Sequence, residues 1–222
     1  MPYGENSKAY LFTNHSPRDI VSGYHNIKTT DHIIAVDNGL KHLDELGLKP
    51  EILVGDQDSV EPALLKKYSQ TPTYLFPSEK NETDTELAFD WCHKHFPDSD
   101  IIICNDFQGR FDHSLSVALL LLKRQLPFAV KMSFPTPYRV ESENQTVFIL
   151  PDSIEFVNCS GKLLSLLPLS PKIEFAFSQN LKYPLTDLII RNYQSRGVSN
   201  VITSDRANII KKEGICLAVL TN

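Results

Sequence analysis

The chain has 222 residues, of which 41% are hydrophobic and 22% charged, and its formal net charge is −5. That length allows one large domain or two small ones, and the near-average composition argues against disorder, collagen and coiled coil. Because 27 acidic residues outnumber 22 Lys and Arg residues and no basic run occurs, we expect no nucleic-acid partner. Polyphosphate ligands are still compatible with this balance, since Mg²⁺ can supply positive charge locally.

The first part of the chain, from residue 9 to about 134, alternates short apolar runs with helical patterns. Strands are predicted, in chain order, at 9–12, 32–37, 52–54, 74–76, 101–104 and 128–130. Helices are predicted from Ser16-Pro17, through Leu40 to Leu46, over 63–68, and from near Asp84 and Asp112. Continuous apolar strands bounded by helices predict a doubly wound, mostly parallel sheet covered on both faces.

The helical period ends after Pro135 and Pro137, and short β-rich runs separated by turn residues follow. These runs lie at 146–150, 154–157, 163–167, 173–177, 188–191, 207–211 and 217–220. Their spacing predicts a smaller all-β sandwich. The sequence thus predicts two domains, an α/β domain over 1–137 and a β-sandwich over 138–222.

Two features of the sequence indicate the cellular compartment of the protein, namely its four cysteines and its first residues. The cysteines are scattered, with no Cys-x-x-Cys pair, at Cys92, Cys104, Cys159 and Cys216. This spacing argues against zinc and against a disulfide framework, and it favours a reducing compartment. The polar stretch Met1 to Lys8 has no signal-peptide pattern, and no apolar run is long enough to cross a membrane. We therefore expect a cytoplasmic protein without a membrane segment.

Polar residues follow the predicted strands, at the edge where ligands bind in doubly wound sheets. In Gly55-Asp56-Gln57-Asp58-Ser59, the two carboxylates at i and i+2 of an extended segment point to one side, where they could share a hard cation. Gly55 would let the backbone or a phosphate approach closely. The alternative is a plain turn in which Asp58 or Ser59 caps the next helix.

The segment Glu82 to Glu86 opens a predicted helix. Thr83 and Glu86 have the spacing of a capping box, and Asp84 in the first turn suits the helix dipole, so a purely structural role explains them. Lys80, just before this segment, is either a phosphate contact or a solvated lysine. The segment alone leaves both interpretations open.

The segment Gln108 to His113 follows the strand at 101–104 and begins another helix. Asp112 is a natural N-cap for that helix. Arg110, beside a glycine at the end of a strand, is typical of a phosphate clamp. The chain has neither a P-loop nor a dinucleotide fingerprint, so a nucleotide site would depend on carboxylate-bound Mg²⁺ and Arg110. Acids with an arginine suit transfer chemistry on a polyphosphate without a covalent enzyme intermediate.

Taken in order, these segments resemble the thiamine pyrophosphokinase family. Asp37 to Lys41 and Gly55 to Ser59 are similar to its Asp-Gly-Gly-Ala-Asn and Gly-Asp-Phe-Asp-Ser runs. Lys80 to Asp84 resembles its Lys-Asp-x-Thr-Asp run, and Gln108 to His113 its Gly-Gly-Arg-x-Asp-His run. Three β-rich segments also resemble the family: Ser165 to Leu169, Asn180 to Leu185 and Arg196 to Asn200. The chain departs from the family's pattern at Asn38, Gln57, Asn81, Gln108 and Asn180.

The resemblance implies an ATP-binding α/β domain and a β-sandwich, working as a homodimer with thiamine pockets between subunits. It implies transfer of the pyrophosphoryl group of ATP to the thiamine hydroxyl, releasing AMP. It assigns Mg²⁺ to Asp56, Asp58 and Asp84, charge stabilisation to Arg110, and thiamine positioning or proton acceptance to Asp37 and Asp112. It further implies substrate contacts at Asn38, Gln108, Ser199 and Asn200, and nucleotide contacts at Lys80, Thr83 and Arg110.

Three alternatives stay open at this stage. One is a pyrophosphokinase for another hydroxymethylated heterocycle, such as a pterin. A second is a Mg²⁺-dependent phosphohydrolase built on Asp56 and Asp58. The third is a non-catalytic nucleotide-binding or structural protein.

Overall fold

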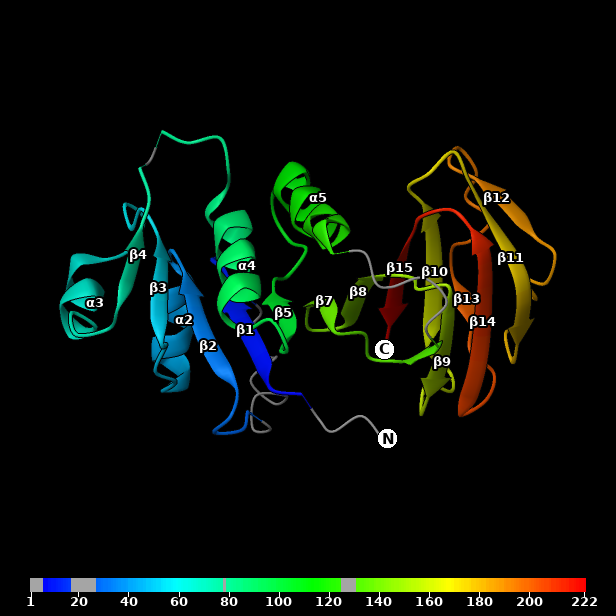
Figure 1. The fold of residues 1–222 in the computed structure, drawn as a ribbon, viewed down its shortest axis with the longest axis horizontal. Coiled ribbons are helices and arrows are strands. Elements are labelled where there is room, and N and C mark those ends of the chain that lie inside the picture. Colours follow the sequence, from blue (N-terminus) through cyan, green and yellow to red (C-terminus); the bar gives the residue numbers. More distant parts are fainter. Residues whose placement is uncertain (1–5, 17–26, 78, 125–130) are drawn as a thin grey trace. The chain divides into compact units, whose positions relative to one another are not determined.

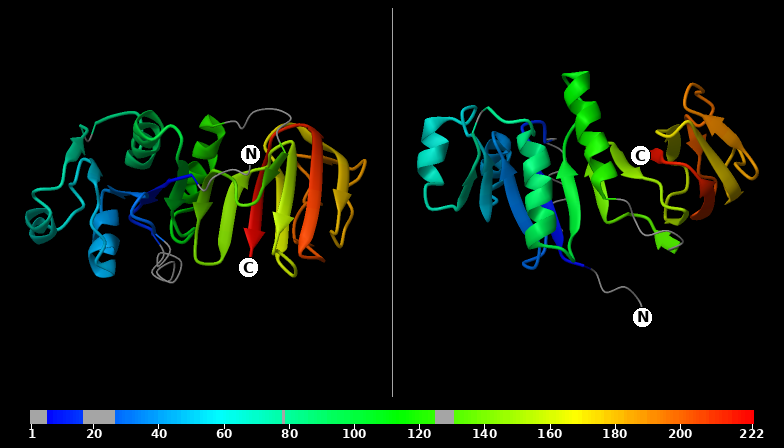
Figure 2. Two further views of the ribbon diagram at one scale, coloured as in Figure 1. Left: turned by 60° about the horizontal axis from the view of Figure 1, so that its bottom comes forward. Right: turned by 45° about the horizontal axis from the view of Figure 1, so that its top comes forward.

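The structure is a computed structural model that describes residues 6–16, 27–77, 79–124 and 131–222. It divides into two compact units (Figures 1 and 2). The first comprises Met1–Leu120 and Val140–Glu143, and the second Leu121–Arg139 and Asn144–Asn222. The sequence places the boundary between residues 137 and 138. In the structure the chain leaves the first unit at Leu120 and returns to it briefly at 140–143.

The first unit is built on a parallel sheet, as predicted. Its strands are β1 (Lys8–Phe12), β2 (His32–Val36), β3 (Ile52–Gly55), β4 (Thr73–Leu75) and β5 (Asp100–Cys104). They lie in the order β5-β1-β2-β3-β4, and each neighbouring pair is parallel. The short strand β7 (Tyr138–Glu141) adjoins β5. The carboxyl ends of β1 to β5 therefore meet at one edge of the sheet.

Helices cover both faces of this sheet, as predicted. They are α2 (Gly39–Leu46), α3 (Pro62–Lys67), α4 (Asp84–His95) and α5 (Phe111–Leu120). Figure 1 shows α4 in front of the sheet and α2 behind it. Leu40 and Leu43 of α2 are fully buried in a cluster with Tyr10 and Phe12 of β1. The opposite strand face is equally apolar, which is why these strands read as continuous hydrophobic runs.

Local signals fix the ends of α2. A Cβ atom on Gly39 would lie 1.9 Å from the Phe12 carbonyl oxygen, so only glycine lets the helix start this close to β1. Gly47 ends the helix in the left-handed conformation (φ 66°), and its N–H is bonded to backbone carbonyls of the last turn. The predicted helix over this segment is confirmed.

One prediction about the first unit needs correction, and two cannot be compared. Asp112 is not the N-cap of α5, because the helix already begins at Phe111 and Asp112 lies in its first turn. The predicted strand 128–130 lies outside the described residues, and the strand that follows it, β6 (Lys131–Ser133), belongs to the second unit. The helix predicted from Pro17 also falls outside the described residues.

The second unit consists of two β-sheets. One has the order β13-β10-β15-β8, with β13 (Asn200–Val201), β10 (Leu163–Pro168), β15 (Cys216–Thr221) and β8 (Gln145–Ile149). The other has the order β12-β11-β14-β9-β6, with β12 (Ile189–Arg191), β11 (Lys172–Gln179), β14 (Arg206–Glu213) and β9 (Ser153–Val157). Side chains of both sheets, including Phe148, Leu164, Phe156 and Phe175, share one buried cluster. The predicted all-β part is confirmed.

Among the described residues no helix is both long and apolar enough to span a membrane.

Candidate functional site

Acidic side chains gather at the carboxyl edge of the parallel sheet. Asp37 directly follows β2, Asp56 directly follows β3, and Asp84 begins α4. The charges of Asp84 and Asp56 both act on Asp37, and the same two charges act on Asp58. The structure therefore brings together the four acids that the sequence predicted for this edge, which we call the carboxylate cluster: Asp37, Asp56, Asp58 and Asp84.

The backbone between the strands is shaped to hold two of these acids together. Asp37 has a φ of 47°, Gly55 one of 136° and Gln57 one of 63°, all on the side of the Ramachandran plot that favours glycine. The Asp37 N–H donates to the Val54 carbonyl oxygen at 2.9 Å, which fastens the end of β2 to β3. A Cβ atom on Gly55 would lie 1.7 Å from Asp37 Oδ1. Glycine at 55 is therefore what allows this approach.

Crowding perturbs the acidity of the cluster. Burial, followed by the charges of Asp84 and Asp56, raises the pKa of Asp37 to about 7. The Asp58 N–H donates to Asp56 Oδ1 at 3.2 Å, and this backbone hydrogen bond lowers the pKa of Asp56. The pKa of Asp58 is raised because it shares a hydrogen bond with Asp56 and feels that residue's charge. Titratable groups whose pKa values are pushed apart are typical of functional sites.

One cation faces this cluster. Lys80 Nζ lies 2.6 Å from Asp84 Oδ1, and the two side chains are only 11% and 18% exposed. The same ammonium group lies 5.7 Å from the centre of the Phe76 ring. Its charge also lowers the pKa of Asp37 and of Asp56.

Asp84 stands where a helix favours negative charge. The Thr83 hydroxyl accepts a hydrogen bond from the Glu86 N–H at 3.2 Å, so Thr83 is the N-cap of α4. This confirms the cap that the sequence predicted. Asp84 follows in the first turn, where the helix dipole stabilises a carboxylate.

The donor set of the cluster suits a hard divalent cation. Carboxylate oxygens are the ligands that Mg²⁺ prefers. Asp37 Oδ1 is buried and has no hydrogen-bond partner among the residues that the structure describes. In the described part of the chain, no three acidic, His or Cys side chains converge closely enough to hold a metal ion as they stand. Mg²⁺ binding would therefore require carboxylates of the cluster to move toward one another.

Arg110 and Asp112 form a pair with each other at the start of α5. Arg110 Nε lies 3.1 Å from Asp112 Oδ1, and Nη2 lies 2.5 Å from Oδ2. Both side chains are mostly exposed, at 71% and 63%. The pairing lowers the pKa of Asp112. Gln108 is also exposed, and Gly109 next to it has a φ of 90°. The fork of Arg110 is thus preformed for an anion, with Asp112 as its present partner.

The ends of β1 and β5 carry a polar network that sequence reasoning missed. Asn38 Nδ2 donates to Asn14 Oδ1 at 2.9 Å, and His42 Nε2 donates to the Asn14 carbonyl oxygen at 3.0 Å. Asn105 Nδ2 donates to the Thr13 hydroxyl at 2.9 Å. Asn14 and Asn105 lie just after β1 and β5, and this position was the available signal, but it does not reveal their hydrogen-bond partners.

The two substrate residues predicted in the second unit differ in exposure. Ser199 is exposed, and its N–H donates to the Ser165 hydroxyl at 3.1 Å. Asn200 is 4% exposed. Its side-chain oxygen accepts from the N–H groups of Tyr183 and Val201 at 3.0 and 2.9 Å, and its amide donates to the Tyr183 carbonyl at 2.7 Å. Asn200 therefore braces the Tyr183 loop.

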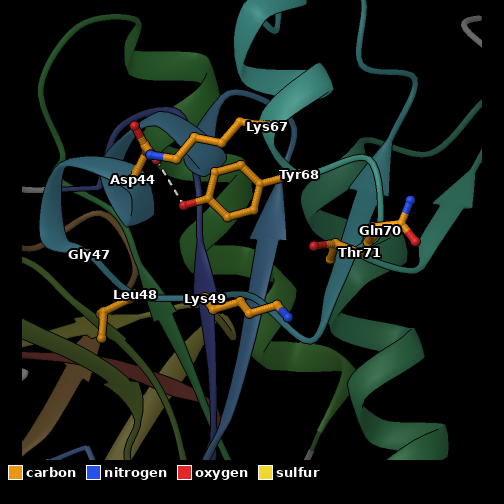
Figure 3. Close-up of a pocket in the computed structure, with 8 residues that line it drawn as sticks. All are labelled: Asp44, Gly47, Leu48, Lys49, Lys67, Tyr68, Gln70 and Thr71. Atoms are coloured by element: carbon orange, nitrogen blue, oxygen red, sulfur yellow. Dashed lines mark hydrogen bonds and ion pairs between the residues drawn. The ribbon is translucent and has the colours of Figure 1, made fainter.

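A cavity of about 380 Å³ lies between the ends of α2 and α3 (Figure 3). Asp44 is one of its lining residues, and it accepts a hydrogen bond from the Tyr68 hydroxyl at 2.9 Å and pairs with Lys67. This cavity is lined by the carboxyl ends of both helices, whereas Asp37 and Asp56 precede them. A second cavity of about 330 Å³ between the same helices reaches Asn38. The first cavity contains none of the residues that the sequence singled out.

The sequence of the chain is similar to that of known proteins. Residues 24–132 match the thiamin pyrophosphokinase catalytic domain. The chain is 26% identical over 189 residues to thiamine pyrophosphokinase of Bacillus subtilis, covering 84% of this chain and 85% of that one. It is 22% identical over 179 residues to thiamin pyrophosphokinase 1 of Caenorhabditis elegans, covering 77% and 70%.

Solved structures show the same fold. The crystal structure of Bacillus subtilis thiamine pyrophosphokinase superimposes with a TM-score of 0.79 at 23% identity, covering 97% of this chain and 99% of that one. The yeast thiamin pyrophosphokinase structure gives a TM-score of 0.76 at 15% identity, covering 100% and 88%. Over the matched catalytic domain and across most of its length, the chain is thus similar in sequence to thiamine pyrophosphokinases, and it has the fold of their solved structures.

Proposed function

We propose that this protein transfers the pyrophosphoryl group of ATP to the hydroxyl of thiamine, giving thiamine diphosphate and AMP. The observation that carries the proposal is the carboxylate cluster beside Lys80, at the carboxyl edge of a parallel sheet, in a chain similar to thiamine pyrophosphokinases. That similarity does not favour a pterin pyrophosphokinase or a phosphohydrolase.

In this reaction the thiamine hydroxyl oxygen forms a bond to the β-phosphorus of ATP. The bond from that phosphorus to the oxygen bridging the α- and β-phosphates breaks, and AMP leaves. The hydroxyl proton needs an acceptor, and the pKa of Asp37, near 7, suits a carboxylate that takes up a proton at neutral pH. We therefore assign proton acceptance to Asp37, and we assign the positioning of thiamine to Asp112.

Asp56, Asp58 and Asp84 would hold Mg²⁺, which when bound neutralises charge on the transferring phosphates. Arg110 would exchange its Asp112 partner for phosphate oxygens, since its planar fork suits either anion. Thr83 can still donate its hydroxyl proton to a phosphate, because its cap uses only the oxygen as an acceptor. Contacts of Asn38, Gln108, Ser199 and Asn200 with thiamine remain predictions.

The proposal includes a homodimer with its active site at the subunit interface. Phe177 and Ile210 support it: they are directly opposite each other on β11 and β14, and they are 40% and 42% exposed. Such an exposed apolar pair suits a surface that a partner covers. Light scattering at several protein concentrations tests this part of the proposal.

The proposal also places the protein in the cytoplasm. All four cysteines are buried free thiols, and burial raises the pKa of Cys159 and Cys216, so they have the character of packed hydrophobes. A reducing compartment suits them.

The test mixes purified protein with ATP, Mg²⁺ and thiamine and follows AMP and thiamine diphosphate by chromatography. Stoichiometric formation of both products supports the proposal. Release of ADP or phosphate without thiamine diphosphate would overturn it in favour of hydrolysis or another acceptor. Replacing thiamine by a hydroxymethylated pterin in the same assay separates the pyrophosphokinase alternatives.

Variants then test the residues. Asp56→Asn and Asp84→Asn should each lower AMP formation by orders of magnitude while circular dichroism stays unchanged. Asp98→Asn, an exposed acid beyond the far end of α4, is the matched control and should keep full activity. Turnover near that of the wild type in both cluster variants would remove them from the metal site.

A further inference from the structure

Lys80 competes for the same carboxylate that a metal ion needs. Its ammonium group lies 2.6 Å from Asp84 Oδ1, and both side chains are largely shielded from water. Its charge acts on Asp37 and Asp56 as well. In the structure Lys80 is thus the counter-ion of the carboxylate cluster, and it occupies one of the ligands that the proposed function assigns to Mg²⁺.

Electrostatic repulsion makes the Lys80 ammonium group and a divalent cation compete for Asp84. The charges of the clustered carboxylates act on one another, and a cation among them relieves that repulsion. Asp84 Oδ1 accepts its closest contact from the Lys80 ammonium group, and a divalent ion bound to Asp84 would lie near that ammonium group and repel it. Metal binding at Asp84 is therefore opposed by Lys80 and favours its displacement.

The surroundings of Lys80 allow it to move without leaving the site. A lysine has a flexible stem and a compact charge, unlike the rigid fork of an arginine. The Phe76 ring lies within cation–π range of the ammonium group, at 5.7 Å, and offers it a second partner. A displaced Lys80 would stay close to whatever anion the metal brings.

We propose that Lys80 is an exchangeable counter-ion: it neutralises Asp84 in the metal-free protein, yields Asp84 to the divalent cation, and then pairs with the phosphates of the nucleotide. This inference rests on the proposed function. It predicts effects of opposite sign when the charge is removed, because Lys80 opposes binding of the metal alone but favours binding of the nucleotide.

The first measurement is binding of Mn²⁺ without nucleotide, followed by electron paramagnetic resonance of the free ion. Lys80→Met should bind Mn²⁺ at least about tenfold more tightly than the wild type, because a competing cation is gone. Lys80→Arg keeps the charge and should bind like the wild type. Lys67→Met removes a lysine whose ion pair with Asp44 lies outside the cluster, and it should leave Mn²⁺ affinity unchanged.

The second measurement is calorimetric titration with the Mg²⁺ complex of a non-hydrolysable ATP analogue. Lys80→Met should bind it about tenfold more weakly than the wild type. Unchanged or weaker Mn²⁺ binding by Lys80→Met would overturn the exchange. Tighter binding of both metal and nucleotide complex would overturn the transfer of Lys80 to phosphate.

Two further variants keep the test decisive. Lys80→Gln, which retains a hydrogen-bond donor without charge, replaces the Met variant if that variant does not fold, and the same outcomes apply. Asp84→Asn distinguishes the metal assignment from the exchange of Lys80. Unchanged Mn²⁺ binding by Asp84→Asn would overturn the assignment of Asp84 to the metal, and with it the exchange. Weaker Mn²⁺ binding by Asp84→Asn, without tighter Mn²⁺ binding by Lys80→Met, would overturn only the exchange.

Discussion

Gly55 and Asp37 approach so closely that a Cβ atom on residue 55 would lie 1.7 Å from Asp37 Oδ1. The two residues come from neighbouring strands, and the Asp37 N–H is hydrogen-bonded to the Val54 carbonyl oxygen. An added methyl group at residue 55 would therefore force the Asp37 carboxylate to move. The glycine therefore determines where a candidate proton acceptor points.

Gly55→Ala should accordingly impair both folding and catalysis. Its φ of 136° is strained for any residue with a side chain, at a cost of about 1–3 kcal/mol in the free energy of unfolding. Displacement of Asp37 should lower kcat by at least about tenfold, equivalent to about 1.4 kcal/mol of activation free energy. Urea unfolding and steady-state kinetics measure the two effects.

Gly47→Ala is the matched control. Its φ of 66° is also left-handed, but nothing lies within 4 Å of the position of its Cβ atom. It should lose about 1–2 kcal/mol of unfolding free energy and retain kcat. Equal kcat values for the two alanine variants would contradict the steric role of Gly55.

The raised pKa of Asp37 predicts a pH dependence of stability in the metal-free protein. The folded-state pKa of about 7 exceeds the ordinary value of 3.8, so the folded chain binds this proton more tightly than the unfolded chain does. The resulting stabilisation is fully present below the ordinary pKa and is lost as the pH rises to about 7. The wild type should therefore lose stability relative to Asp37→Asn across that window.

The measurement is urea unfolding of both proteins in EDTA, at intervals from pH 4 to pH 8. The difference between the two profiles reports Asp37 together with its charge interactions with Asp84 and Asp56. Parallel profiles would show that Asp37 titrates in its ordinary range.

Sequence patterns predicted the elements that local signals define. The helix α4 was found because Thr83 and Glu86 mark its start, and α2 because Gly47 marks its end. The strands β7 and β13 were missed because they are short and carry no alternating pattern of their own. The three-residue strand β6 was missed as well, because its residues Lys131–Ser133 form no apolar run.

Sequence patterns likewise predicted some features of the candidate site and not others. Parallel topology alone places Asp37 and Asp56 at one edge, so their convergence could be predicted from their positions after strands. The partners of side chains could not. The ion pair between Lys80 and Asp84 depends on side-chain rotamers. The hydrogen bonds of Asn200 depend on the Tyr183 loop, which is 17 residues away in sequence.

Thr83 has two separable roles in our interpretation, as an N-cap and as a phosphate donor. Thr83→Ala should lose about 1 kcal/mol of unfolding free energy, because the Glu86 N–H loses its partner, and should raise the KM for ATP severalfold. Thr83→Asn restores the capping acceptor and therefore the stability, but it should not restore the KM. Thr83→Ser should restore both. A wild-type KM in the Asn variant would confine Thr83 to capping.

We expect Asn200 to contribute to the stability of the fold as well as to thiamine binding. Asn200→Ala leaves three partly buried backbone groups without their partner, two on Tyr183 and one on Val201, which should cost about 1–3 kcal/mol in unfolding free energy. Ser199→Ala, at an exposed neighbour, should change stability by less than about 0.5 kcal/mol. Under the proposed function both variants raise the KM for thiamine, but only Asn200→Ala lowers the unfolding midpoint. A variant at 200 with wild-type stability and a raised KM would show instead that its amide contacts substrate directly, because the Tyr183 loop would then hold without it.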